Sequence, residues 1–419
     1  MTDKTGLARK LNTTDAVVIG LGSMIGAGVF AAFGPAAEAA GSGLLVGLAI
    51  AAVIAYCNAT ASAQLAAVYP VSGGTYIYGR ERLGPWWGFI AGWGFVIGKT
   101  ASCTAMALTV ATYAVPEPWW AQRLVAIGAV VALAALNYRG VTKTAELARI
   151  LITITLASLA VVVLAILVAG NPALENLDGL SSLGSGGVYG ILQAAGLLFF
   201  AFAGYARIAT MGEEVHDPAQ TIPKAIPIAL FLTVVVYVIV GVSVLLAAGP
   251  DRLSASTAPL VTAIQDAGVG NLAPVVRVGA IVASLGTLLA LIAGIGRTSL
   301  AMARHGDLPS WLAAVHPRYQ VPHHAELALA AVVSLLVLAI DLRGAIGFSS
   351  FGVLVYYAIA NASAFTQPAE QRRWPRVLNL AGLIGCVVLV VTLPVQAVVT
   401  GVAVLAIGLA GRYIVLHGR

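Results

Sequence analysis

Charged residues are scarce in this chain of 419 residues. Asp, Glu, Lys and Arg together make up only 10% of it, apolar residues make up 59%, and the mean hydropathy is +0.93. A soluble protein of this length needs far more charge to cover its surface, so the composition excludes an ordinary water-soluble enzyme. The net charge of +6 is modest and gives no reason to expect a nucleic-acid partner.

Clusters of reactive residues are missing as well. The three cysteines lie inside apolar runs, which predicts buried thiols and no disulfide framework. The histidines lack the spacing of metal ligands, and no group of His, Asp, Glu, Ser or Cys gathers within an apolar run. We therefore expect no enzyme activity, no metal and no cofactor. No long hydrophilic stretch divides the chain, so we expect one membrane domain over residues 1–419.

Apolar runs of roughly 18–25 residues dominate the sequence, and this is the length needed to cross about 30 Å of hydrocarbon. Inside a membrane each backbone amide must be bonded within its own segment, which requires helices. The alternation of a transmembrane barrel is absent from runs such as 159–167. We predict an all-α integral membrane protein with twelve transmembrane helices, near residues 15–40, 43–69, 84–114, 120–137, 145–170, 187–212, 222–248, 271–303, 324–341, 343–365, 376–393 and 395–415.

Lys and Arg are unevenly distributed among the connections. With the N-terminus inside, 17 of the 23 fall on the cytoplasmic side and 4 on the outer side, while Lys99 and Arg207 lie within spans. Cytoplasmic loops of membrane proteins carry such an excess of positive charge. We therefore expect a multi-pass protein of the cell membrane (plasma or inner), surrounded by lipid, with both the N- and the C-terminus in the cytoplasm.

Glycines cluster in the first apolar segment, at positions 20, 22, 26, 28 and 34. A glycine weakens a helix interior by about 1 kcal/mol relative to alanine, so the cluster permits an unwound stretch at Gly26-Ala27-Gly28. Such a stretch is tolerated in a membrane only where it lines a cavity, and the free N–H groups of the next half-helix suit a carboxylate. Close packing of helices through small residues is the alternative.

The sixth segment is also interrupted, by Gly204 and the charged Arg207. It lies five helices after the first, where an inverted repeat places the counterpart of the first segment. Interrupted segments in corresponding positions of two halves indicate the binding site of a transporter. The two halves share no convincing residue identity, so hydropathy and helix count alone support the repeat.

Four stretches of the sequence resemble motifs of the amino acid–polyamine–organocation (APC) transporters. They agree with that family in order and spacing: residues 22–30 (GSMIGAGVF), 70–78 (PVSGGTYIY), 199–204 (FFAFAG) followed by 213–218 (EEVHDP) and 222–226 (IPKAI), and 301–309 (AMARHGDLP). The resemblance implies the LeuT-type fold, a 5+5 inverted repeat with broken helices 1 and 6. Repeat 1 would cover 10–170, repeat 2 would cover 187–365, and helices 11 and 12 would cover 376–415.

The resemblance also implies how a substrate is held. In that family amides of the first break bind the substrate carboxylate, which maps to Gly26, Ala27 and Gly28. Carbonyls at both breaks bind its ammonium, with Phe202 as a gate or lining side chain. These carbonyls map to Met24, Ile25, Phe200, Ala201 and Ala203. A zwitterionic amino acid would thus meet donors at one end and acceptors at the other.

The sequence departs from that family where ion coupling is concerned. Many members carry a lysine midway along helix 5, and Thr155 stands at that position. Lys99 lies instead in the middle of the third span, where a charge must face a cavity or a partner. It could carry a proton, bind an acidic substrate group, or pair statically with a carbonyl or with a carboxylate such as Glu38. Sodium coupling would need hydroxyls of helix 8, where Ser284 and Thr287 are available.

Arg207 has three interpretations: closing a cytoplasmic gate against Glu213 or Glu214, contacting an anionic substrate, or reaching the inner interface. The residues together favour a secondary active amino acid transporter that works by alternating access. A small neutral or acidic amino acid is favoured, because positive charge accompanies the site, and protons would be coupled through Lys99. The alternatives are a polyamine or organic cation transporter and an amino acid exchanger without ion coupling.

Overall fold

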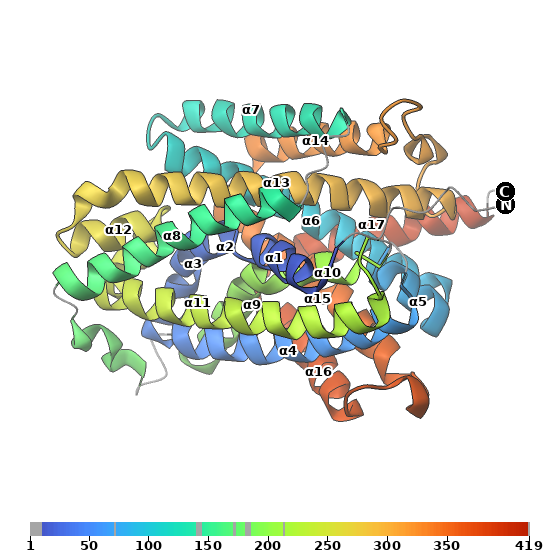
Figure 1. Cartoon of the computed structure of the whole chain (residues 1–419), viewed down its shortest axis with the longest axis horizontal. Helices are drawn as coiled ribbons and strands as arrows, with labels where there is room; N and C mark the ends of the chain where they lie inside the picture. The colour runs from blue at the N-terminus through green and yellow to red at the C-terminus, as the bar shows by residue number, and fades with distance from the viewer. Residues whose placement is uncertain are drawn as a thin grey trace.

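Helices make up almost all of the structure, which is a computed structural model that describes residues 11–70, 73–139, 145–170, 173–180, 186–212 and 214–417. Figure 1 shows them as a bundle of long, roughly aligned rods. The α-helices are α1 (Thr13–Met24), α2 (Ala27–Ala31), α3 (Phe33–Ala40), α4 (Leu44–Val68), α5 (Thr75–Leu83), α6 (Pro85–Ala114), α7 (Trp119–Tyr138), α8 (Ala145–Ala169), α9 (Gly187–Phe202), α10 (Ala206–Ala209), α11 (Pro218–Ala255), α12 (Pro259–Asp266), α13 (Ala273–Arg304), α14 (His323–Ala339), α15 (Leu342–Phe365), α16 (Arg376–Thr392) and α17 (Val395–His417). Short 3₁₀ turns separate some of them, namely η1 (Gly41–Gly43), η2 (Leu174–Leu180), η3 (Ala203–Tyr205), η4 (Gly270–Leu272), η5 (Ser310–Ala313) and η6 (Ala369–Gln371).

Within the described residues, 10 helical stretches are long and apolar enough to cross a membrane. Two shorter apolar helices, α14 and α16, lie where the ninth and eleventh spans are predicted. The described part contains no strand, only an isolated parallel bridge between Leu11 and Val215. The prediction of an all-helical, multi-pass membrane protein is therefore confirmed. The count of twelve spans and the inverted repeat stay predictions.

Local sequence signals explain several helix boundaries. Asn12 and Asp15 form a reciprocal capping box at the start of α1, in which each side chain accepts a hydrogen bond from the other residue's backbone N–H. Pro85 is the first residue of α6. The residue before it, Gly84, has a φ of 106°, a backbone conformation that residues with a side chain rarely adopt. Asp341 caps α15 by accepting from the N–H of Gly344.

The core of the bundle is built around α6. In the apolar window of α6, 94% of the residues are buried, compared with 17% in α7 and 11% in α17. The neighbours of α6 are α13 and α15, while α7 and α14 pack side by side along one edge (Figure 1). A polar side chain midway along α6 is therefore shielded from lipid by other helices.

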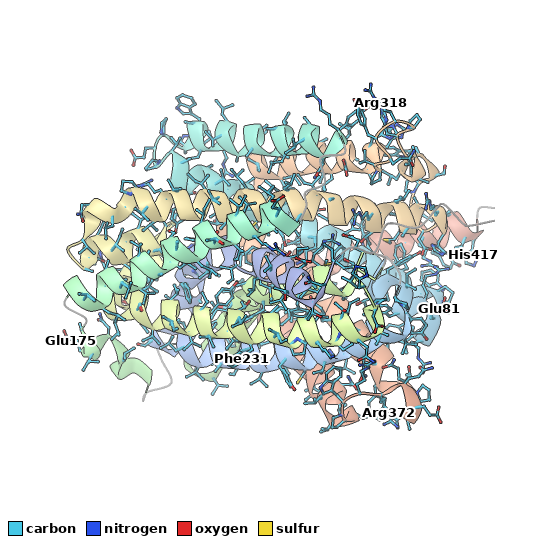
Figure 2. All side chains as sticks on the ribbon, in the orientation of Figure 1. Glu81, Glu175, Phe231, Arg318, Arg372 and His417 are labelled. Atoms are coloured by element: carbon cyan, nitrogen blue, oxygen red, sulfur yellow. The ribbon has the colours of Figure 1, made fainter. Side chains whose placement is uncertain are left out.

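Charged groups lie at the ends of the bundle and apolar ones around its middle. Figure 2 shows Glu81, Arg318, Arg372 and His417 toward one end and Glu175 at the other. Phe231 projects outward midway along α11 and is 67% exposed. This arrangement is typical of a protein whose middle faces hydrocarbon and whose ends face water.

Candidate functional site

The first membrane segment breaks between α1 and α2. Ile25 (φ −80°, ψ 67°) and Gly26 (φ −113°, ψ −144°) leave the helical conformation. The N–H of Gly26 turns back to the carbonyl of Met24 at 2.8 Å. Ala27 and Gly28 then form the first turn of α2, where helix N–H groups have no partner within the helix. The unwound residues are thus 25 and 26, at the N-terminal edge of the predicted glycine break.

The sixth segment changes its winding at the corresponding place. The α-helix α9 ends at Phe202, the 3₁₀ turn η3 follows, and α10 adds a single further turn. Ala203 already departs from helical geometry, with ψ at 4°. Carbonyl groups near this change of winding are free to accept hydrogen bonds from other helices.

The two breaks pack directly against each other, and glycine makes this possible. A Cβ atom on Gly204 would lie 2.2 Å from the carbonyl oxygen of Ser23, and one on Gly28 would lie 2.5 Å from the Cβ of Ala201. Both distances are far below van der Waals contact. The backbone N–H and C=O groups that the two breaks leave without a partner in their own helix therefore lie in one small region of the core.

Tyr237 of α11 connects the two breaks. Its hydroxyl lies 2.6 Å from the carbonyl oxygen of Met24 and 3.0 Å from that of Ala201, so its one hydrogen is shared between acceptors on both broken helices. The ring packs against Phe202, with the centroids 5.1 Å apart. Phe202 is therefore a packing partner of Tyr237 in this conformation. Two of the carbonyls predicted to hold an ammonium group are occupied by a neutral hydroxyl.

Lys99 of α6 contacts the second break. Its ammonium donates to the carbonyl of Ala203 at 3.0 Å, and the hydroxyl of Tyr357 in α15 approaches the same oxygen at 3.3 Å. Only 5% of the lysine is exposed. Glu38, considered from the sequence as a possible partner, forms an ion pair with Arg343 instead.

The first N–H group of α2 lacks a strong acceptor such as a carbonyl or carboxylate oxygen among the described residues. The N–H of Ala27 points at the thioether sulfur of Met106, 3.4 Å away on α6. Thioether sulfur is only a weak acceptor, so a carboxylate oxygen at that place would form a much stronger hydrogen bond.

A cavity of about 50 Å³ lies beside the breaks. It reaches from Lys99, Ser23 and Thr287 at the breaks to Arg207 and Arg297 at its other end. This volume holds little more than water, because ligand pockets usually measure about 300–1,000 Å³. The structure therefore represents a closed conformation of the site.

An ion-pair cluster closes the end of this cavity away from the breaks. Arg207 donates to both carboxylate oxygens of Glu214, at 3.0 and 3.1 Å, and Arg297 of α13 donates to one of them at 2.8 Å. Burial opposes ionisation of Glu214, but the two guanidinium groups outweigh it and lower the pKa of this carboxyl. The charged network therefore persists at neutral pH. Of the two partners predicted for Arg207, the structure places Glu214 there, and Glu213 lies outside the described residues.

The remaining predicted residues lie apart from these contacts. The hydroxyl of Thr155 bonds the carbonyl of Leu151 in its own helix. Ser284 is fully buried, and its hydroxyl has no partner among the described residues. The hydroxyl of Thr287, one turn further along α13, lies 3.1 Å from the carbonyl oxygen of Gly22 and so reaches the first broken helix.

A larger cavity of about 1150 Å³ lies elsewhere and is lined mainly by residues of α3, α6, α14, α15 and α17. Its walls are mostly apolar, and none of the residues of the two breaks lines it. Size alone therefore does not single out a candidate site, whereas the backbone groups freed at the two breaks and the buried charge of Lys99 favour the breaks as the candidate.

Four side chains at the site escaped the sequence analysis, namely Met106, Tyr237, Arg297 and Tyr357. Each lies in a regular helical stretch. Nothing in the neighbouring sequence therefore indicates that the side chain comes close to the breaks. Arg297 is one of the 17 Lys and Arg that the sequence predicts on the cytoplasmic side, but the sequence does not predict its ion pair with Glu214. An alignment of related sequences over α11 and α15 would be the signal most suited to finding Tyr237 and Tyr357.

Comparisons with known proteins also indicate a membrane transporter. A family model described as amino acid permease matches residues 11–415. A protein of Mycobacterium tuberculosis named as an uncharacterized transporter is 60% identical over 96% of this chain and 90% of its own length. The branched-chain amino acid permease BcaP of Bacillus subtilis is 26% identical over 90% of this chain and 84% of its own length. Human cationic amino acid transporter 4 is 27% identical over 86% and 60% of the two chains.

Proposed function

Since this chain belongs to the amino acid permease family of the APC superfamily, we propose that it is a secondary active amino acid transporter whose substrate lies between the two helix breaks. The observation that carries the proposal is the pairing of two kinds of backbone group in one place. The N–H of Ala27 has only a thioether sulfur as its acceptor, and the carbonyls of Met24, Ala201 and Ala203 accept hydrogen bonds from other helices.

An α-amino acid complements this arrangement at both ends. Its carboxylate would replace the sulfur of Met106 at the start of α2, where the helix dipole adds favourable charge. Its ammonium would take over acceptors that now bind the Tyr237 hydroxyl and the Lys99 ammonium. The site is closed in the free protein because its own side chains occupy the acceptors.

Alternating access follows from the cluster at the end of the cavity. With Arg207, Glu214 and Arg297 paired, the path from the breaks to that end is shut. We propose that this end is cytoplasmic, as the distribution of Lys and Arg predicts, and that the pairs separate when the inner side opens. Twelve spans, the 5+5 inverted repeat over 10–170 and 187–365, and cytoplasmic termini complete the proposal.

The charges around the site favour a small neutral or acidic side chain. Arg207 and Arg297 line the cavity and keep their charge at every physiological pH, and the nearby Glu214 is already held by both of them. A cationic side chain would add repulsion there. The relatives named for branched-chain and for cationic amino acids show that the family covers both classes, so a polyamine or cationic substrate remains the alternative.

Coupling is proposed to run through Lys99, since Thr155 offers no titratable group at the usual position. Sodium is the second candidate, with two hydroxyls of α13: that of Thr287, which reaches the first broken helix, and that of Ser284, which has no partner among the described residues. A sodium requirement for transport would favour the second candidate.

A thermal-shift screen of the purified protein tests the proposed substrate class. The twenty amino acids and putrescine are added one at a time, at two pH values and with or without sodium. We expect saturable stabilisation by one or more small neutral or acidic amino acids. Stabilisation by arginine or putrescine alone would move the assignment to the alternative.

Replacing Tyr237 with phenylalanine is expected to tighten substrate binding and slow turnover. The free protein loses the donor that covers the carbonyls of Met24 and Ala201, and leaving buried acceptors uncovered costs about 1–3 kcal/mol. The bound state loses less, because the substrate ammonium covers the same carbonyls. Apparent affinity should therefore rise up to about tenfold. Tyr113→Phe, which removes a hydroxyl bonded to the carbonyl of Phe30 away from the unwound residues, should leave affinity unchanged.

Replacing Glu214 with glutamine is expected to favour opening of the cavity at the Arg207 end. The substitution leaves Arg207 and Arg297 facing each other without a negative charge. Because the pairs are partly exposed, the effect should be on the order of 1 kcal/mol, a roughly fivefold shift in population. The labelling rate of a cysteine placed at Thr298, in the cavity wall, measures it. Glu214→Asp keeps the charge and should label more slowly than Glu214→Gln; equal rates would contradict the gate.

A further inference from the structure

The ammonium of Lys99 and the ammonium of a substrate need the same acceptor. Lys99 donates to the carbonyl of Ala203 at 3.0 Å, and this oxygen belongs to the second break. The other hydrogen-bond donor on it is the hydroxyl of Tyr357 at 3.3 Å, which is neutral and can rotate away. Rotation of the Lys99 side chain is not enough, because its positive charge would still repel a second ammonium nearby.

No carboxylate of the described residues pairs with the ammonium of Lys99. None of the ion pairs of the described residues includes it. The groups facing it from the neighbouring elements are the hydroxyls of Tyr357 on α15 and Thr287 on α13, with Arg207 on α10 and Arg297 on α13 further along the cavity. Its own helix adds the thiol of Cys103, one turn away. The carboxylate of Glu214 lies at that end of the cavity but is already paired with both arginines. No carboxylate of the described residues pairs with Lys99, so its charged form loses its acceptor when another ammonium takes the Ala203 carbonyl.

From this competition we infer that the transporter exchanges a proton for an amino acid, because the substrate ammonium and the Lys99 proton exclude each other at the Ala203 carbonyl. This inference rests on the proposed function. On one side of the membrane the amino acid binds and Lys99 releases a proton to that side, leaving a neutral amine. On the other side the amino acid leaves, and the amine takes up a proton from there. The empty carrier returns with Lys99 protonated.

The direction of flux follows from this cycle. Each amino acid moved one way accompanies one proton moved the other way. Where the outside is more acidic than the cytoplasm, protons run inward, so the amino acid is driven outward. The protein would then act as an amino acid exporter, whereas a proton symporter with the same site would import.

Proteoliposomes under opposite pH gradients distinguish the two directions. The probe is a ¹⁴C-labelled mixture of the twenty amino acids, and potassium with valinomycin holds the membrane potential at zero. We expect initial uptake to be at least about fivefold faster with an acidic lumen than with an alkaline one. A proton-sensitive dye inside the vesicles should report alkalinisation as the amino acids enter. Faster uptake with an alkaline lumen, or uptake that ignores the gradient, would overturn the inference.

Two variants at position 99 connect the effect to this lysine. In the wild type the apparent KM should rise by up to about tenfold for each unit that the pH falls, because proton and substrate compete. In Lys99→Met the KM should no longer depend on pH, and the two gradients should give equal rates, whatever the absolute rate. In Lys99→Arg the permanent charge should hold the KM high at every pH. A gradient response that survives in Lys99→Met would overturn the inference.

The same vesicles separate failure of the inference from failure of the proposed function. Vesicles loaded with unlabelled amino acids and kept at equal pH exchange label if the protein transports amino acids at all. Exchange without any gradient effect defeats proton antiport and leaves amino acid transport standing. Absence of exchange and of uptake under both gradients defeats both.

Discussion

Gly204→Ala is expected to reduce transport severely while the chain still inserts and folds. The added Cβ would lie 2.2 Å from the carbonyl oxygen and 2.3 Å from the carbonyl carbon of Ser23, and 2.6 Å from the amide nitrogen of Met24. All three are backbone atoms, so no side-chain rotation relieves the contact. The two breaks would have to move apart, which separates the acceptors of the site at a cost of about 3 kcal/mol. Uptake should fall about a hundredfold.

Gly22→Ala is the matched control for this prediction. Gly22 lies on the same broken segment, two residues from the end of α1, but a Cβ there would meet nothing within 4 Å. Alanine also suits a helix better than glycine, by about 1 kcal/mol. This variant should transport and should be slightly more stable. Equal activity of the two variants would show that the close approach of the breaks does not matter.

Asp307→Ala should cause the largest loss of stability. Asp307 is 4% exposed and pairs with Arg80 at 2.9 Å and with Arg412 at 3.1 Å, while Tyr76 donates a hydrogen bond to it at 2.7 Å. Arg412 is itself only 6% exposed and holds α17 against the start of α6. Removing the carboxylate leaves a buried guanidinium without its partner, which costs about 3–5 kcal/mol. We expect little folded protein, or a greatly lowered melting temperature.

The control for Asp307 is a second Asp–Arg pair at the surface. Asp266 bonds Arg252 through two hydrogen bonds, at 2.8 and 3.1 Å, but the arginine is 68% exposed. Water and salt already screen such a pair, so Asp266→Ala should leave the melting temperature of the purified protein nearly unchanged. A similar loss in both variants would contradict the role given to burial.

Sequence alone predicted the parts of this fold that depend on local composition. Apolar runs placed the helices within a few residues, because a membrane segment must be long and internally hydrogen-bonded. The glycines at 26 and 28 placed the first break, and Gly204 placed the second. The four motifs led to the amino acid permease family, which the comparisons confirm.

Contacts between distant helices could not be predicted in the same way. Tyr237 is separated from Met24 by more than two hundred positions, and nothing in the surrounding α11 sequence marks its hydroxyl as a donor to the breaks. Lys99 was recognised as unusual from its charge, but its partner was left open between a carbonyl and a carboxylate. The carbonyl of Ala203 is a backbone atom, so only the packing of α6 against η3 reveals it.

Solute counterflow tests the central claim most directly, that this protein transports an amino acid bound between its two helix breaks. Proteoliposomes are loaded with an unlabelled amino acid and diluted into a trace of the labelled one, without any ion gradient. We predict a transient accumulation of label for at least one small neutral or acidic amino acid, present in Gly22→Ala and absent in Gly204→Ala. Failure of all twenty amino acids to show counterflow in the wild type would contradict the claim.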